Sequence, residues 1–197
     1  MTKTRYPTWD VLAAREEWDE HTRSVIAKRM QEPGPPAFFT PDEAAVLQAA
    51  IARLVADDDP WTTAKVAAMI DTVVGQGPGD NYRQTTMPPD KELWRQIFAR
   101  LGPDFASLAP DQQDQRLTDL QHRHPQHFKA LHKEVVSHYC ALPPVWSFMG
   151  YGGPAFPRGY VRIELGLQDP WEPEQTGPDD QPEQGGGAPR EGASRHE

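Results

Sequence analysis

Hydrophobic residues recur every three or four positions along most of the chain, the spacing that places them on one face of an α-helix. The pattern is strongest after Pro88-Pro89, where five large apolar residues between positions 93 and 101 share one face. Further stretches with this spacing cover about residues 19–30, 41–55, 61–74, 110–120 and 125–142. The sequence therefore predicts an all-α fold, a small irregular bundle of about five or six helices. We expect its core to contain Leu47, Ile51, Ile70, Phe98, Leu131 and Val135.

The clearest helix start lies at residues 38–43. Thr40 is placed as the N-cap, Pro41 takes the first helical position, and Glu43 completes a capping box. Phe39 comes just before the cap, where an apolar side chain packs onto the first turns of a helix. The helix stops at a run of three aspartates, residues 57–59, which we interpret as a solvated helix end.

Residues 146–160 form the most unusual segment, WSFMGYGGPAFPRGY. It combines aromatic residues, which favour burial, with glycine and proline, which disfavour regular structure. Because Pro143-Pro144 must end the preceding helix, we expect a long loop here. The loop either binds a partner protein or folds back and caps its own bundle. An N-terminal arm containing Tyr6, Trp9 and Trp18 is also expected to dock.

Aromatic side chains dominate the energetics of many protein interfaces, and glycines allow a close approach of two backbones. On these grounds we predict a partner-binding set and no catalytic, cofactor-binding or metal-binding residues. The partner-binding set is Trp146, Phe148, Tyr151, Gly152, Gly153, Phe156, Arg158, Tyr160 and Trp9.

Four regions are predicted along the chain. Residues 1–37 form a partner-docking arm and helix, and residues 38–142 form the bundle core. Residues 143–171 form the aromatic-glycine interaction segment, in which residues 160–165 alternate like a lone strand or an extended segment on a partner. Residues 172–197 hold seven acidic and two basic residues and almost no apolar ones, so we expect a disordered acidic tail.

The formal net charge is −9, and the body of the chain has no basic stripe, which argues against nucleic-acid binding. No apolar run approaches the roughly 18 residues that a membrane-spanning helix needs. The N-terminus shows neither an apolar signal region nor an Arg-Arg pair. We therefore expect a cytoplasmic location, or a periplasmic one only if a partner carries the chain. Cys140, the single cysteine, excludes an internal disulfide and is expected to be buried.

Five histidines gather between His122 and His138. A metal site is one interpretation, and a stand-alone metal-dependent enzyme would be the corresponding function. The spacing does not favour it, because His127, His132 and His138 are five and six residues apart and do not share a helix face. A helical adaptor unrelated to redox chemistry is a further alternative.

Three motifs in order resemble the gluconate 2-dehydrogenase subunit 3 family. They are FFTPDE at residues 38–43, FASLAPDQQD at residues 105–114 and WSFMGYGGP at residues 146–154. The resemblance covers about residues 38–160. It implies a non-catalytic accessory subunit that stabilises, matures or helps to export a large catalytic flavoprotein of the glucose-methanol-choline (GMC) type.

By the same resemblance, the flavoprotein partner holds FAD and oxidises a sugar, a sugar acid or an alcohol. A cytochrome c subunit carrying haem c joins many such complexes. This chain is expected to bind no cofactor itself. Many members of the family begin with a twin-arginine signal, whereas this sequence has none.

Overall fold

A computed structural model describes residues 4–77, 87–155 and 159 of the chain. Within these ranges the backbone is helical and contains no strand, which confirms the predicted all-α class. The described residues form seven α-helices and two 3₁₀ helices, more than the five or six predicted. In chain order they are η1 (Val11–Glu17), α1 (Glu20–Arg29), α2 (Pro41–Val55), α3 (Pro60–Gln76), α4 (Asp90–Leu101), η2 (Phe105–Ser107), α5 (Pro110–Arg123), α6 (Pro125–Tyr139) and α7 (Pro143–Met149).

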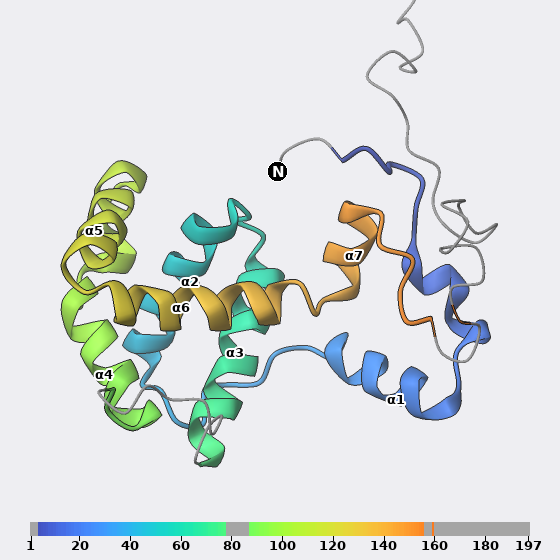
Figure 1. Ribbon diagram of the computed structural model, residues 1–197, viewed down its shortest axis with the longest axis horizontal. Coiled ribbons are helices and arrows are strands. Elements are labelled where there is room, and N and C mark those ends of the chain that lie inside the picture. The colour runs from blue at the N-terminus through green and yellow to red at the C-terminus, as the bar shows by residue number, and fades with distance from the viewer. Residues whose placement is uncertain (1–3, 78–86, 156–158, 160–197) are drawn as a thin grey trace, which may run out of the picture.

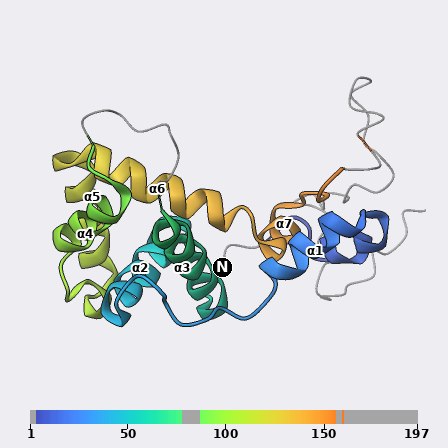
Figure 2. The same ribbon diagram turned by 90° about the horizontal axis from the view of Figure 1, so that it is seen from below.

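The helices gather at two ends of an elongated molecule (Figure 1). Helices α2 to α6, together with η2, form what we call the bundle. Helix α6 runs from α5 along the length of the molecule and leads to α7. There α7 lies beside η1 and α1, and the view from below shows the same separation (Figure 2). We call residues 4–30 and 143–153 together the arm unit.

Each end has its own apolar core. The bundle core contains all six residues that the helical spacing predicted, each at most 7% exposed. The arm unit has a smaller core of four buried residues, and these are Val11, Trp18, Ile26 and Trp146.

The predicted start of α2 is confirmed in atomic detail. The Thr40 hydroxyl accepts a hydrogen bond from the Glu43 N–H at 3.2 Å, and the Glu43 carboxylate accepts one from the Thr40 N–H at 2.9 Å. Two otherwise unsatisfied helix-end groups are thereby paired. Phe39 lies 4% exposed in the core, with its ring 5.6 Å from Trp94 and 5.0 Å from Phe98.

Two buried charges on α3 hold the segments that surround it. The Lys65 ammonium donates to the Lys28 and Gln31 carbonyls at 3.2 and 2.7 Å, at the C-terminal end of α1, where a helix favours a positive charge. The Asp71 carboxylate accepts hydrogen bonds from the backbone N–H groups of residues 37, 38 and 39. Helix α3 therefore positions both the end of α1 and the start of α2.

Two sequence interpretations are wrong. Cys140 is exposed rather than buried, because α6 ends at Tyr139 and Cys140 lies in the turn toward α7. Asp57 is only 3% exposed, so the aspartate run is not simply a solvated helix end.

The strand-like segment at residues 160–165 and the acidic tail lie outside the described residues. In the part of the chain that is described, no helix has the length and apolar character to cross a bilayer.

Candidate partner-binding site

The aromatic segment begins as a helix, which corrects the expectation of a long loop from residue 143 onward. Pro143 and Pro144 occupy the first turn of α7, where a missing N–H group is no loss and the fixed φ angle suits the helix. The proline pair therefore ends one helix and begins the next. Helix α7 ends at Met149, and its C-cap Gly150 has a φ of 71°. The Tyr151 N–H donates to the Trp146 carbonyl at 2.9 Å.

Trp146 is the centre of the arm unit and is 6% exposed. Its indole N–H donates to the Cys140 carbonyl at 2.6 Å, so the ring is fixed to the turn between α6 and α7. The Arg29 guanidinium of α1 lies 5.6 Å from the centre of the Trp146 ring, and the Tyr151 ring meets it edge to face at 5.5 Å. Trp146 thus joins α1, α7 and the end of α6.

The N-terminal arm is bound to α7 and to Tyr151 just after it by three hydrogen bonds that span more than 130 residues of sequence. The Thr4 hydroxyl donates to the Phe148 carbonyl at 2.6 Å. The Val11 N–H donates to the Ser147 hydroxyl at 3.1 Å, and the Trp9 indole N–H donates to the Tyr151 carbonyl at 3.2 Å. Trp9 and the aromatic segment, which the sequence grouped in one set, therefore lie together.

The glycines allow the segment to approach this arm closely. A Cβ atom at Gly150 would lie 2.3 Å from the Tyr6 ring, and one at Gly153 would lie 2.8 Å from the Val11 side chain. Both glycines also have positive φ angles, which L side chains rarely adopt. Gly152 is buried beside them. The close approach seen in the structure is to the chain's own arm, so contact of Gly152 and Gly153 with a partner stays a prediction.

Two apolar side chains of the segment remain open to solvent. Tyr151 is 41% exposed and Met149 is 45% exposed, whereas Phe148 is half-buried. Met149 was missing from the predicted set because the segment was expected to be a loop, in which no helical face can be assigned. Phe156, Arg158 and Tyr160 lie outside the described residues.

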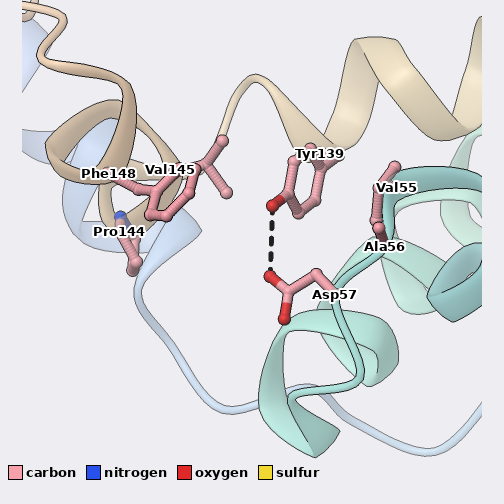
Figure 3. A pocket seen from close by; sticks show the side chains of 7 residues that line it. All are labelled: Val55, Ala56, Asp57, Tyr139, Pro144, Val145 and Phe148. Atoms are coloured by element: carbon pink, nitrogen blue, oxygen red, sulfur yellow. Dashed lines mark hydrogen bonds between the residues drawn. The ribbon is translucent and has the colours of Figure 1, made fainter. Parts of the chain in front are cut away.

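A pocket lies where α7 meets the bundle (Figure 3). Its walls come from the α2–α3 connection, the end of α6 and α7, and the lining residues are Val55, Ala56, Asp57, Tyr139, Pro144, Val145 and Phe148. The Tyr139 hydroxyl donates to the Asp57 carboxylate at 3.1 Å. Burial, reinforced by the charge of Asp57, raises the pKa of Tyr139, so this hydroxyl stays protonated at neutral pH.

The volume of this pocket is about 60 Å³, and a second pocket beside α3 measures about 110 Å³. Pockets for cofactors and drug-sized ligands start at roughly 300 Å³. Neither pocket has room for a flavin. Both are of a size that suits one side chain or a few water molecules.

The five histidines of the predicted cluster are spread along α5 and α6. The His127 Nε2 donates a hydrogen bond to the Gln96 Oε1 at 2.9 Å. Burial, together with nearby Arg100 and His124, lowers the pKa of His127. His132 stacks on Phe128, and His138 lies 3.5 Å from Glu134. Among the described residues, no three His, Cys, Asp or Glu side chains are grouped so that they could hold a metal ion.

These features define a class of small helical protein that presents an aromatic-glycine segment packed on its own N-terminal arm. The sequence profile described as gluconate 2-dehydrogenase subunit 3 matches residues 41–153, from the start of α2 to Gly153. The chain therefore belongs to the gluconate 2-dehydrogenase subunit 3 family. Searches of curated proteins and of solved structures gave no match.

Proposed function

We propose that this chain is a non-catalytic accessory subunit of an FAD-dependent dehydrogenase complex. Its partner is a large flavoprotein of the GMC type that oxidises a sugar, a sugar acid or an alcohol. The observation that carries this proposal is the family match, which extends through α7 to Gly153 and so includes the first part of the aromatic-glycine segment. A cytochrome c subunit with haem c is a further candidate member of the complex.

The geometry supports a binding role for the segment. Met149 and Tyr151 project from the end of α7 with more than 40% of their surfaces exposed, although both are residue types that interfaces favour. Trp146 and the arm hold this end of α7 in place before a partner arrives. A preorganised anchor loses less conformational freedom on binding than a flexible one.

The family match supports placing the redox chemistry in the partner. We therefore assign FAD to the flavoprotein, and to this chain the stabilisation, maturation or export of that partner. We propose that the chain acts in the cytoplasm and reaches the periplasm only when its partner carries it.

The test is co-expression with a GMC-type flavoprotein from the same genome, followed by affinity purification. We expect a yellow complex whose absorbance spectrum reports bound FAD. The Tyr151→Ala variant should weaken the complex by about 2 kcal/mol, or about 30-fold in dissociation constant, if Tyr151 is a binding hot spot. Circular dichroism should show that the variant keeps its helical content, because Tyr151 lies outside the bundle core.

Val73→Ala is the matched control, because Val73 is an apolar residue with a similar exposure of 45% on α3 of the bundle. It should leave the complex intact. Equal losses in the two variants would show that the end of α7 is not the binding surface. Purification of this chain without any flavoprotein would contradict the proposed function and would favour a helical adaptor unrelated to redox chemistry.

A further inference from the structure

Three charged side chains are buried within the described part of the chain, and they differ in how their charges are compensated. They are Lys65, Asp71 and Asp57, each at most 8% exposed. A charge taken out of water destabilises the protein unless hydrogen bonds or an opposite charge replace the lost hydration. The hydrogen-bond partners and opposite charges around each side chain therefore indicate whether its charge is fully compensated within this chain.

Lys65 and Asp71 are well compensated by backbone groups. Lys65 donates to two carbonyls at the C-terminal end of α1, where the helix dipole adds a favourable interaction. Asp71 accepts from three successive backbone N–H groups at distances from 2.6 to 3.2 Å. Both side chains therefore stabilise this chain's own fold by holding neighbouring backbone segments in place.

Asp57 has fewer partners. One carboxylate oxygen accepts from the Tyr139 hydroxyl and the other from the Asp59 N–H, each at 3.1 Å. A carboxylate can accept about four hydrogen bonds. No lysine, arginine or histidine in the described ranges forms an ion pair with it, unlike Asp104 and Asp114, which each pair with an arginine.

The side that Asp57 leaves open faces the pocket between the bundle and α7. Figure 3 shows the Asp57–Tyr139 hydrogen bond between two walls, with Val55 and Ala56 on one side and the α7 residues on the other. The walls are apolar except for the carboxylate and the tyrosine hydroxyl. A negative group in the lining of an apolar, partly aromatic pocket suits a cation at the end of an aliphatic stem.

The geometry points to a site for a basic side chain, and we propose that the pocket binds an arginine or lysine of the flavoprotein partner. The pocket volume of about 60 Å³ suits the end of one side chain rather than a free cofactor. Phe148 belongs to both the pocket and the predicted partner-binding set, so the pocket adjoins that surface. The net charge of −9 further favours a partner with a basic surface. The identity of the partner rests on the proposed function, whereas the chemistry of the pocket does not.

The first test uses n-butylguanidinium as a probe and n-butylurea as its neutral counterpart of similar shape. Both are titrated into the ¹⁵N-labelled full-length protein at constant ionic strength, and the amide shifts of residues around the pocket are followed by NMR. We expect saturable shifts at residues 55–57, 139 and 145 with the cation only. Because this comparison uses the unaltered protein, it does not depend on the folding of a variant. Equal shifts with both probes, or no saturable shift with the cation, would overturn the proposal.

The second test compares Asp57→Asn with Asp58→Asn. The two variants remove the same charge from adjacent positions, but Asp58 is exposed and does not line the pocket. Asp57→Asn should weaken binding of n-butylguanidinium by about tenfold or more, and Asp58→Asn should change it less than about twofold. Similar losses in both variants would mean that the general negative charge attracts the probe.

Purification of the flavoprotein with the same variants separates this proposal from the proposed function. Asp57→Asn should reduce recovery of the flavoprotein, and Asp58→Asn should not. If the pocket binds the cation but both variants recover the flavoprotein equally, the partner does not use the pocket. If the unaltered chain recovers no flavoprotein at all, the proposed function fails while the result with n-butylguanidinium still decides whether the pocket binds a cation.

Discussion

In the bundle, helices α2 to α6 bury a continuous apolar core, to which Val145 of α7 also belongs. The separate core of the arm unit has only four residues, and its N-terminal part relies on directional contacts with α7 and the residues that follow it. Three hydrogen bonds and the Trp146 ring hold the N-terminal arm against this end of the chain. Gly150 and Gly153 allow the close approach, because there is no room for a side chain at either position. The stabilisation from buried apolar area is roughly proportional to that area, whereas a hydrogen bond or a close backbone contact depends on the exact position of a few atoms. Small changes should therefore open the arm unit while the bundle stays folded.

The two regions meet at α3 and at the turn after α6. Lys65 holds the end of α1, Asp71 holds the segment before α2, and Trp146 binds the Cys140 carbonyl. The pocket with Asp57 lies at the same junction, and α7 supplies one of its walls. Opening of the arm unit would move that wall, so the state of the arm and the shape of the pocket are linked.

The largest effect is expected in the bundle. Leu131 is fully buried on α6, and Leu131→Ala would leave a cavity in the centre of the core. The free energy of unfolding should fall by about 3 kcal/mol, within the usual range for such changes. Chemical denaturation followed by circular dichroism measures this value. Val73→Ala, on an exposed surface of α3, should change it by less than about 0.5 kcal/mol. A loss below about 1 kcal/mol for Leu131→Ala would show that α6 is not central to the core.

A smaller and local effect is expected in the arm unit. Gly150→Ala places a Cβ atom against the Tyr6 ring in a left-handed conformation, with an expected destabilisation of about 2 kcal/mol. Hydrogen exchange should become faster in residues 4–30 and 143–153, while the bundle keeps its protection. Gly34→Ala is the control, because a Cβ atom there meets no atom within 4 Å. Uniformly faster exchange in all helices would show that the two regions unfold as one unit.

An effect of about 1 kcal/mol is expected at the start of α2. Thr40→Ala removes the acceptor for the Glu43 N–H and with it one half of the capping box. The midpoint temperature for thermal unfolding of the bundle should fall. The hydrogen-exchange rates of the arm unit should stay unchanged at low temperature. An unchanged midpoint would mean that the cap adds nothing to the stability of α2.

The contrast between the two regions also explains what could be predicted from the sequence. The bundle follows from local patterns, since helical spacing marks Leu47, Ile51 and Leu131, and the cap at Thr40 uses contacts within four residues. The arm unit depends on contacts between residues more than 130 positions apart, for which a single sequence carries no local signal. The same applies to Asp57, whose burial depends on Tyr139 of a distant helix.

The predicted partner-binding set shows the same limit. Aromatic and glycine content marked Trp146, Tyr151, Gly152, Gly153 and Trp9 as partner-binding residues, and their contact with a partner stays a prediction. The structure packs them against the arm of the same chain, which composition could not distinguish from another protein. The proline pair before Val145 was interpreted only as a helix end, although prolines are also common in a first helical turn. That ambiguity concealed α7 and, with it, the exposed position of Met149.

The smallest effect is expected for the ion pair between α2 and α5 of the bundle. The Arg53 guanidinium donates two hydrogen bonds to Asp114 at 2.7 and 2.6 Å, and these lower the pKa of Asp114 below its ordinary 3.8. The unfolded chain therefore takes up this proton first, so the stabilisation is complete above pH 3.8 and is lost as the pH falls through the lowered pKa. Both side chains are about a third or more exposed, so the pair should contribute only about 0.5 kcal/mol, and less at high salt.

Asp114→Asn should lower the free energy of unfolding by that amount at pH 7 and have no effect at a pH below the lowered pKa. Asp119→Asn on the same helix, where Gln115 rather than an arginine is the partner, is the control and should change the free energy of unfolding at pH 7 by less than Asp114→Asn does. An Asp114→Asn effect that persists at low pH would mean that packing, and not charge, holds α5 against α2.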